Sequence, residues 1–351
     1  VSIVGNSGEK TYDGTEQSVQ GYTVSAISNN LYNKSDVKYI GAGVQPAASG
    51  TDAGTYAMGL KSADFNGENE FFKNVRFVIE NDGSLTIKKR SVTLTSSDAS
   101  KQYDGTPLTN ETITAGDNDF VKGDTFTKSV TGSQLNAGSS ENKFTYTLVD
   151  SNGAELDKSE DDSYRNYDVS TKFGTLKVTP VDSEVVVTIV GKHVDAKYNG
   201  EEHDVSGFEF TSSNPLYTKD KIKYPETSTY ISRKDAGKTS MGLKVADDPS
   251  RGIVNVDTAN FPHVRFEITD GYVEISKRSV TLTSATDRKQ YDGTPLTNSG
   301  VTVGGDGFVD GEGATYVFTG SQTLVGSSAN AFTYDLNGNT KVDNYAIDKT
   351  E

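Results

Sequence analysis

Three histidines are the residues of this sequence best suited to bind a metal ion, because imidazole is a common zinc ligand. His193 and His203 flank the turn Tyr198-Asn199-Gly200, and a hairpin at that turn would bring the two rings face to face. Two weakly spaced histidines are poor evidence for zinc, and a related N-terminal segment has Ser7 and Gln17 in their places. We therefore interpret the histidines as exposed hairpin residues and predict no metal site.

Two acidic stretches, Asp150–Asp162 and Asp306–Glu312, are candidate calcium ligands because calcium binds carboxylate oxygens. Neither stretch has the ligand spacing of an EF-hand, since the glycine needed at the sixth position is Glu155 when the count begins at Asp150. We interpret both stretches as solvated loops. Calcium held between modules, where it would stiffen the array, is the alternative.

Lysine and asparagine side chains on paired strands raise a further hypothesis, an internal isopeptide crosslink formed with loss of ammonia. The pairs Lys101 with Asn166 and Lys289 with Asn344 occur at matching positions of two repeats. Both residue types are also ordinary at strand ends and in turns, so the spacing alone does not single out a crosslink.

Catalysis has few candidate residues here. The sequence contains no Cys nucleophile, no histidine shared between repeats and no Gly-rich phosphate loop after a strand. Carboxylates are plentiful, yet small tandem modules seldom form the single deep pocket that an enzyme needs. We predict that the protein is not an enzyme and that it has no catalytic, cofactor-binding or metal-binding residues.

Composition and charge restrict the partners. The chain has 351 residues with 49 acids against 34 bases, a net charge of −15. This charge argues against nucleic acid and against an anionic membrane, both of which require a basic face. No apolar run is long enough to span a bilayer, and the sequence begins directly in the strand-like segment Val1–Val4, so we expect an excised piece of a longer protein.

Repeats determine the expected architecture. The decapeptide Lys-Gln-Tyr-Asp-Gly-Thr-Pro-Leu-Thr-Asn occurs at Lys101–Asn110 and again, word for word, at Lys289–Asn298. A second repeat alternates with it: Asp-Ala-Gly and Met-Gly-Leu-Lys, at residues 52–54 and 58–61, return at residues 235–237 and 241–244. The order is A-B-A′-B′, with modules at residues 1–88, 89–180, 181–277 and 278–351.

All four modules contain Tyr-Asp-Gly or Tyr-Asn-Gly, at residues 12–14, 103–105, 198–200 and 291–293. A ligand-binding loop is one interpretation. The other is a structural turn, in which Tyr packs into the core, Asp accepts hydrogen bonds from nearby backbone and Gly adopts a positive φ. Because every module has the motif, we favour the turn.

Short segments with alternating apolar and polar residues predict half-buried strands. Val92 and Leu94 alternate with threonines, as do Phe144, Tyr146 and Leu148. No segment carries a long helical stripe, although one short helix per module, for example near Leu31–Ser35, fits the sequence.

The fourth module is shorter than the second. Asn166-Tyr167 aligns with Asn344-Tyr345 at an offset of 178 (344 − 166), against 188 for the decapeptides (289 − 101), so B′ lacks ten residues of the acidic loop. The sequence also ends at Glu351, before any counterpart of Gly174–Thr179. We predict a missing final strand and an exposed sheet edge there.

At these residues the sequence resembles a known family. The B modules resemble the YDG-type repeats of Firmicutes surface proteins, through Lys101–Asn110, Thr-Gly-Ser-Gln and Asn166-Tyr167. The A modules are similar to the MBG-like modules that often accompany them, through Asp-Ala-Gly, Met-Gly-Leu and Val-Arg-Phe. The resemblance covers nearly the whole chain. It implies a large adhesin-like protein anchored to the cell wall and displayed at the surface of a Gram-positive bacterium.

We therefore expect an all-β protein of four small, Ig-like β-sandwich modules in a linear, elongated array, with short connections between them. The alternative is a β-grasp-like module with one short helix. The expected function is a non-catalytic, monomeric stalk that projects a distal binding domain. Two alternatives stay open: modules that themselves bind a host glycoprotein, mucin or matrix protein, and homotypic association in biofilm.

Overall fold

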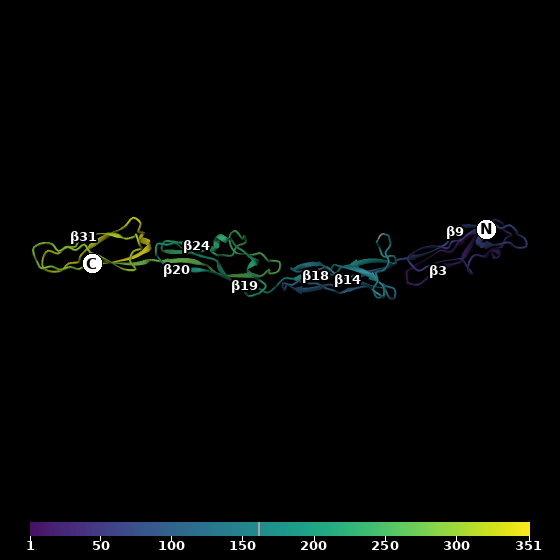
Figure 1. Cartoon of the computed structure of the whole chain (residues 1–351), viewed down its shortest axis with the longest axis horizontal. Helices are drawn as coiled ribbons and strands as arrows, with labels where there is room; N and C mark the ends of the chain where they lie inside the picture. Colours follow the sequence, from purple (N-terminus) through teal and green to yellow (C-terminus); the bar gives the residue numbers. More distant parts are fainter. Residues whose placement is uncertain (161) are drawn as a thin grey trace. The chain divides into compact units, whose positions relative to one another are not determined.

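The computed structural model describes residues 1–160 and 162–351, which form two compact units, Val1–Thr179 and Pro180–Glu351. Each unit contains one A-type and one B-type module, in that order along the chain (Figure 1). The prediction of all-β, Ig-like modules is confirmed. The β-grasp alternative is wrong, because the described residues form no α-helix. Their helices are short 3-10 turns: η1 (Lys34–Asp36), η2 (Ser62–Asp64), η3 (Lys219–Lys221), η4 (Glu226–Thr229) and η5 (Val342–Asn344).

The two A-type modules have the same order of strands. In the first they are β1 (Ser2–Gly5), β2 (Gly8–Thr11), β3 (Gln17–Gln20), β4 (Tyr22–Ala26), β5 (Lys38–Tyr39), β6 (Ala47–Gly50), β7 (Gly54–Ala57), β8 (Phe65–Asn66), β9 (Val78–Asn81) and β10 (Ser84–Lys88). In the second they are β19 (Val185–Gly191), β20 (His193–Lys197), β21 (His203–Ser206), β22 (Phe208–Ser212), β23 (Ile222–Lys223), β24 (Tyr230–Arg233), β25 (Gly237–Ser240), β26 (Val254–Asn255), β27 (Val264–Thr269) and β28 (Tyr272–Ser276).

The two B-type modules differ in the number of strands. Module B has β11 (Arg90–Ser96), β12 (Ala99–Gln102), β13 (Ile113–Thr114), β14 (Thr125–Val130), β15 (Gly138–Glu141), β16 (Phe144–Val149), β17 (Tyr167–Lys172) and β18 (Thr175–Thr179). Module B′ has β29 (Arg278–Ser284), β30 (Val301–Gly305), β31 (Ala314–Phe318), β32 (Phe332–Leu336) and β33 (Tyr345–Thr350).

In each module, strands at its beginning pair in parallel with strands at its end. In module B, β11 pairs with β17 from Arg90↔Tyr167 to Thr95↔Lys172, and β12 then pairs with β18. The A-type modules repeat this two-step arrangement, with β1–β9 followed by β2–β10 and with β19–β27 followed by β20–β28. The beginning and the end of each module are therefore joined by strands that run in one direction.

The core of module B lies between two sheets. Val92 and Leu94 of β11 are 1 % and 0 % exposed and pack in one cluster with Phe144 and Leu148 of β16. The sheets β13-β11-β17 and β14-β16 therefore face each other across an apolar interior. The alternation of apolar residues with threonine predicted this arrangement, since successive side chains of a strand point to opposite faces.

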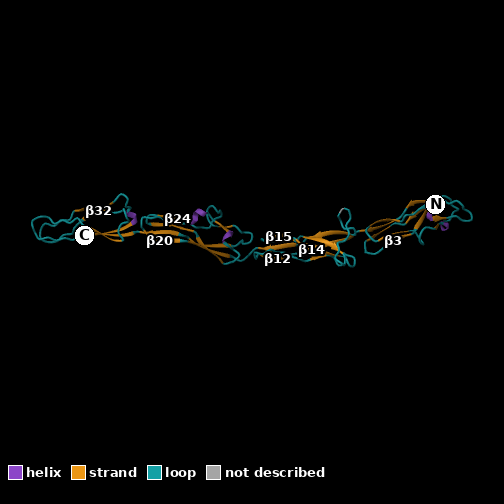
Figure 2. Cartoon of the chain, viewed as in Figure 1, coloured by secondary structure: helices purple, strands orange, loops and turns teal. Residues whose placement is uncertain are grey.

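The described residues of module B′ end with β33, the counterpart of β17. The counterparts of β12 and β15 in this module, residues 287–290 and 326–329, are not in strands. Figure 2 draws this part of the second unit largely as loops.

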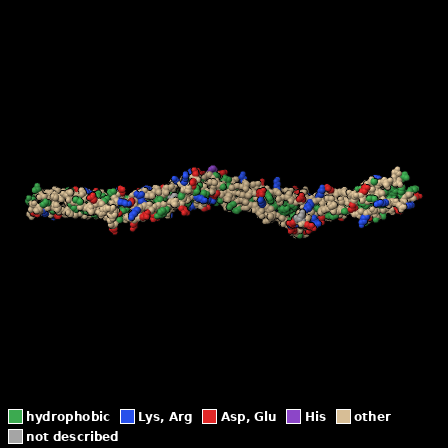
Figure 3. Space-filling model, turned by 90° about the horizontal axis from the view of Figure 1, so that it is seen from above, with side chains coloured by type: hydrophobic (Ala, Val, Ile, Leu, Met, Phe, Trp, Pro, Cys, Tyr) green, Lys and Arg blue, Asp and Glu red, His purple; other side chains and the backbone are tan. Residues whose placement is uncertain are grey.

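Charged side chains of both signs are interspersed on the face drawn in Figure 3, with no broad area of one sign. Within the part of the chain that the structure describes, no helix has the length and apolar character needed to cross a bilayer.

Candidate functional site: the joints between A-type and B-type modules

The three histidines do not come together in one site. His193 stacks on Tyr272 with ring centroids 5.1 Å apart, whereas Nε2 of His203 lies 3.0 Å from Oδ1 of Asn199. His263 is exposed. Over residues 1–160 and 162–351, no group of three or more His, Asp or Glu side chains could hold a metal ion.

Carboxylates of the two acidic stretches pair with nearby backbone N–H groups and lysine side chains. Oδ1 of Asp150 accepts hydrogen bonds from the backbone N–H groups of Ala154 and Asn152, which lower the pKa of its carboxyl group. Glu155 forms an ion pair of 2.9 Å with Lys158. Asp161 of this loop lies outside the described residues. In the other stretch, Asp306 forms an ion pair of 2.8 Å with Lys197.

The crosslink hypothesis is wrong in this structure. Lys101 Nζ donates to Asp104 at 2.7 Å in its own turn, whereas Asn166 bonds to Asp52 of the preceding module. Arg90 is paired beside Tyr167, the neighbour of Asn166, and Lys101 lies eleven residues further along (101 − 90). At about 3.3 Å per residue, this separates the two groups by on the order of 35 Å. Lys289 and Asn344 are separated in the same way.

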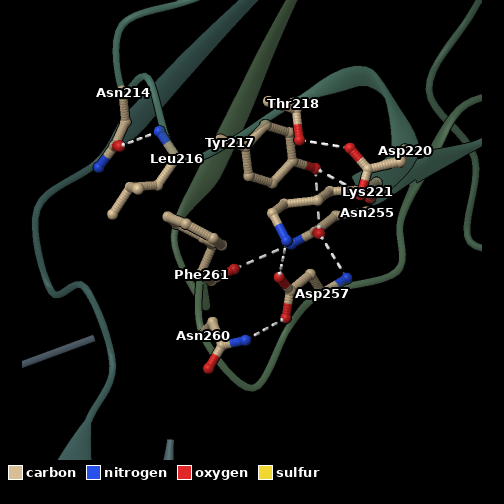
Figure 4. A network of polar contacts seen from close by, with 10 residues as sticks. All are labelled: Asn214, Leu216, Tyr217, Thr218, Asp220, Lys221, Asn255, Asp257, Asn260 and Phe261. Carbon is tan, nitrogen blue, oxygen red and sulfur yellow. Dashed lines mark hydrogen bonds and ion pairs between the residues drawn. The ribbon is translucent and has the colours of Figure 1, made fainter. Parts of the chain in front are cut away.

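One well-shielded ion pair lies in module A′ (Figure 4). Lys221 Nζ and Asp257 Oδ2 are 2.7 Å apart, each side chain is 17 % exposed, and Asn260 donates to the same carboxylate at 2.8 Å. Nearby, the Tyr217 hydroxyl donates to Oδ1 of Asn255 at 3.0 Å. These bonds join the segment between β22 and β23 to β26 and the loop that follows it.

The Tyr-Asp/Asn-Gly motifs are turns, as predicted. In each of them, Oδ1 of the Asp or Asn accepts a hydrogen bond from the backbone N–H two residues later, at 2.9 to 3.0 Å. The glycines have φ of +79° to +84°, which favours glycine over any residue with a Cβ. The tyrosines differ: Tyr198 is 3 % exposed, whereas Tyr291 is 60 % exposed.

In the A-type modules this turn lies against the following B-type module. We call these contacts the first joint and the second joint. The first joint consists of Tyr12, Gly14, Asp52 and Ala53 with Arg90, Val121, Asp124, Asn166 and Tyr167. The second consists of Tyr198, Gly200, Asp235 and Ala236 with Arg278, Val309, Glu312, Asn344 and Tyr345.

An asparagine clasp is the most regular contact of the joints. In the first joint, Asn166 Oδ1 accepts from the Ala53 N–H at 2.7 Å, and Asn166 Nδ2 donates to Asp52 at 2.9 Å. Asn344 makes the same two bonds to Ala236 and Asp235 in the second joint, at 2.7 and 2.9 Å. A planar amide that both donates and accepts across the boundary fixes the distance and orientation of the two modules.

An arginine at the start of each B-type module reinforces the clasp. The Arg90 guanidinium donates to the carbonyl of Tyr12 at 3.3 Å and to the carbonyl of Asp119 at 3.0 Å. Arg278 reaches the Tyr198 carbonyl at 3.5 Å and the carbonyls of its own module at residues 306 and 307. The fixed fork of the guanidinium thus connects the turn of one module with a loop of the next.

The turn glycine also allows close packing. A Cβ built at Gly14 would lie 3.4 Å from Val121, and one built at Gly200 would lie 2.9 Å from Val309. The positive φ disfavours a residue with a Cβ at both positions, and at Gly200 the close approach of Val309 disfavours it further.

Tyrosines and an acidic residue form the centre of each joint. Tyr12 and Tyr167 meet edge to face with centroids 5.6 Å apart, as do Tyr198 and Tyr345 at 5.5 Å. Glu312 accepts from both hydroxyls of the second joint, at 2.6 Å from Tyr198 and 2.7 Å from Tyr345. Burial, together with this carboxylate, raises the pKa of each of these two tyrosines to about 12.

The corresponding residue of the first joint is one methylene shorter. Asp124 accepts from the Tyr167 hydroxyl at 2.6 Å, while burial, followed by the electrostatic influence of Asp124, raises the pKa of Tyr12. Sequence reasoning noted Asp-Ala-Gly and Asn-Tyr as repeated motifs but did not predict that they meet. The recurrence of both motifs in the two units, in the same order, was the available signal.

Comparison with known proteins assigns no family to this chain. No protein-family model matches it, and no curated protein matches it in sequence. The crystal structure of Sidekick-1 immunoglobulin domains 1–4 aligns over 99 % of this chain and 97 % of its own, with 8 % identity and a TM-score of 0.18. The TIE protein of Bacillus anthracis aligns over 98 % of this chain and 72 % of its own, with 10 % identity and a TM-score of 0.19. TM-scores this low carry no argument about function.

Proposed function

We propose that the chain is a load-bearing, non-catalytic part of the shaft of a bacterial cell-surface protein, where it holds a distal binding domain away from the cell wall. The observation that carries the proposal is the parallel pairing, in every module, of strands at its beginning with strands at its end. The resemblance of the sequence to YDG-type and MBG-like repeats supports the location at the surface.

Parallel terminal strands suit a shaft for a mechanical reason. Tension enters a module through its opening strands and leaves through its closing strands. Because the opening strands pair with closing strands that run in the same direction, the tension slides the two sets past each other and loads their hydrogen bonds together. Strands pulled apart from one end would instead lose their bonds one at a time. The rate of forced unfolding is therefore expected to be low.

The joints support the same function. The asparagine clasp, the arginine fork and the edge-to-face tyrosines join the A-type to the B-type module without a flexible linker. Lys89 alone separates β10 from β11. A tightly connected pair of modules keeps its end-to-end distance, which is what a spacer requires.

Single-molecule pulling on module B tests the proposal, and the absence of Cys makes introduced cysteines unique attachment points. Ser91→Cys with Lys172→Cys pulls β11 and β17 along their length. Ser91→Cys with Asp168→Cys is the matched control, because these two residues are direct partners and pulling on them peels the strands apart. All three positions are exposed.

We expect a several-fold higher rupture force for the first pair. When the whole chain is pulled from its ends, each of the first three modules, with about 90 residues, is expected to release roughly 300 Å of chain at about 3.5 Å per residue. Equal rupture forces for the two cysteine pairs would contradict a load-bearing role.

A further inference from the structure

The turn of module A′ differs from the other three Tyr-Asp/Asn-Gly turns in its middle residue. Asn199 stands where residues 13, 104 and 292 are aspartates, and Gly200 follows it. An asparagine before glycine can react with its own backbone, when the glycine nitrogen attacks the side-chain carbon Cγ and closes a succinimide ring. Glycine favours this closure because it has no Cβ to shield the nitrogen. The second joint therefore contains a pair of residues that can modify itself.

The amide oxygen of Asn199 has two donors beside it. Oδ1 accepts a hydrogen bond from the backbone N–H of Glu201 at 3.0 Å, and Nε2 of His203 lies 3.0 Å from the same oxygen. Because Oδ1 can only accept, the second contact is a hydrogen bond when His203 carries a proton on Nε2. Negative charge develops on this oxygen when a nucleophile attacks Cγ, so the two donors form a small oxyanion hole.

The attacking nitrogen is accessible. Asn199 is exposed, and within residues 1–160 and 162–351 the N–H of Gly200 forms no hydrogen bond. No internal bond therefore has to break before solvent base removes the proton of this N–H.

Three other Asn-Gly pairs, at residues 66–67, 152–153 and 337–338, provide a comparison within the same chain. Asn66 Oδ1 accepts the backbone N–H of Glu68 at 3.0 Å, in the same way as Asn199. In the part of the chain that the structure describes, none of these three amides has a histidine as a second donor. The histidine is therefore the feature that distinguishes Asn199.

We propose that Asn199 is a self-modification site, at which His203 and the backbone N–H of Glu201 promote deamidation. The Gly200 nitrogen gives its proton to solvent base and forms a bond to Cγ. The bond between Cγ and Nδ2 breaks, and Nδ2 takes a proton from solvent and leaves as ammonia. Water then opens the succinimide ring and leaves aspartate or isoaspartate at position 199, so the net reaction consumes one water and releases one ammonia. This site is independent of the proposed load-bearing role.

The two products should affect the second joint differently. Aspartate fits the turn, since the aspartates of the other three turns accept the same backbone hydrogen bond at 2.9 Å. Isoaspartate inserts an additional methylene into the main chain between Tyr198 and Gly200. Tyr198 is buried, and a Cβ at Gly200 would lie 2.9 Å from Val309 of module B′. Formation of isoaspartate should therefore disturb the packing of this joint and limit its lifetime.

The test incubates the intact chain at neutral pH and follows all four Asn-Gly pairs by peptide mapping with mass spectrometry. In the folded chain we expect Asn199 to deamidate at least about fivefold faster than the other three asparagines, because an added donor to the developing oxyanion lowers the barrier. In urea the four rates should converge, since the local structure is lost and each asparagine precedes glycine. A rate for Asn199 in the folded chain that does not exceed the other three would overturn the proposal.

His203→Phe isolates the second donor, because phenylalanine keeps a ring but cannot donate to Oδ1. In this variant Asn199 should deamidate at the rate of the other three asparagines. His193→Phe is the matched control, since His193 stacks on Tyr272 of the same module and should leave the rate at Asn199 unchanged. If Asn199 keeps its higher rate in His203→Phe, or loses it equally in His193→Phe, the proposal is wrong. The comparison within the unsubstituted chain decides the proposal even if a variant does not fold.

Discussion

The first and second joints share one framework but differ in how many polar contacts cross the boundary. Both have the asparagine clasp, the arginine fork and the pair of tyrosines. The second joint adds three bonds across the boundary: Tyr198 to Glu312 at 2.6 Å, Lys197 to Asp306 at 2.8 Å and Lys341 to Asp235 at 2.7 Å. At the matching positions the first joint has Thr11, Asn118 and Ser163, none of which carries a charge.

The acidic loop of module B occupies the corresponding side of the first joint. A hollow of about 220 Å³ there is lined by Tyr12 and Tyr167 together with loop residues Glu155 and Asp157. In B′ the loop is ten residues shorter, and Lys341 reaches back to the A-type module instead. The shared framework therefore sets the position of the modules, while a few exchangeable side chains set how firmly they are held.

Removal of the clasp should have the largest effect. Asn344→Ala leaves the N–H of Ala236 and the carboxylate of Asp235 without this partner, at a cost of about 2–3 kcal/mol, since Asn344 is fully buried. Asn166→Ala should cost less, about 1–2 kcal/mol, because Asn166 is half-buried. Native-state hydrogen exchange at Ala236 and at Ala53 measures the two losses.

Asn152→Ala, in an exposed turn of module B, is the control for these variants. Unchanged exchange rates at Ala236 and Ala53 in the clasp variants would mean that the amides do not hold the joints.

Substitution of the acidic residue at the centre of a joint, Glu312 or Asp124, should have a smaller effect. It tests directly whether the length of this side chain makes the two joints differ. Glu312→Asp shortens the side chain so that it no longer reaches both tyrosines, and we expect a loss of about 1–2 kcal/mol at the second joint. The reciprocal change, Asp124→Glu, should slow exchange of the Ala53 N–H by giving Tyr12 a carboxylate partner. If both substitutions weaken their joints, each acidic residue is fitted to its own site, and side-chain length does not explain the difference in stability between the two joints.

A decrease in pH should produce the smallest of these differences in stability between the two joints. The pKa of Asp235 is lowered by Lys341 and Asn344, and that of Asp306 by Lys197 and the Ser279 N–H. A folded-state pKa below the unfolded value means that the stabilisation is present above about pH 4 and is lost as the pH falls below it. The protection factor of the Ala236 N–H, its exchange rate relative to an unfolded peptide at the same pH, should therefore fall on acidification more than that of the Ala53 N–H. Lys197→Thr with Lys341→Ser should remove the difference.

The sequence predicted the repeats and strands well because both are local patterns. Val92 and Leu94 alternate with threonine, and this period places them in the core without any knowledge of their partners. The asparagine clasp could not be predicted in this way, because Asn166 lies 113 residues from Ala53 and no periodicity connects them. The hypothesis of an isopeptide crosslink was wrong for a related reason. Lys101 and Asn166 have counterparts in both B-type modules, but this recurrence reflects shared ancestry and does not show that the two side chains are close.

The spacing across the first joint also bears on the order in which the chain is made. Asn166 leaves the ribosome 113 residues after Ala53, its partner in the clasp. At about 5–20 residues per second, module A exists for roughly 6–23 s before the first joint can close. Module A is therefore expected to fold on its own core and to acquire the joint afterwards.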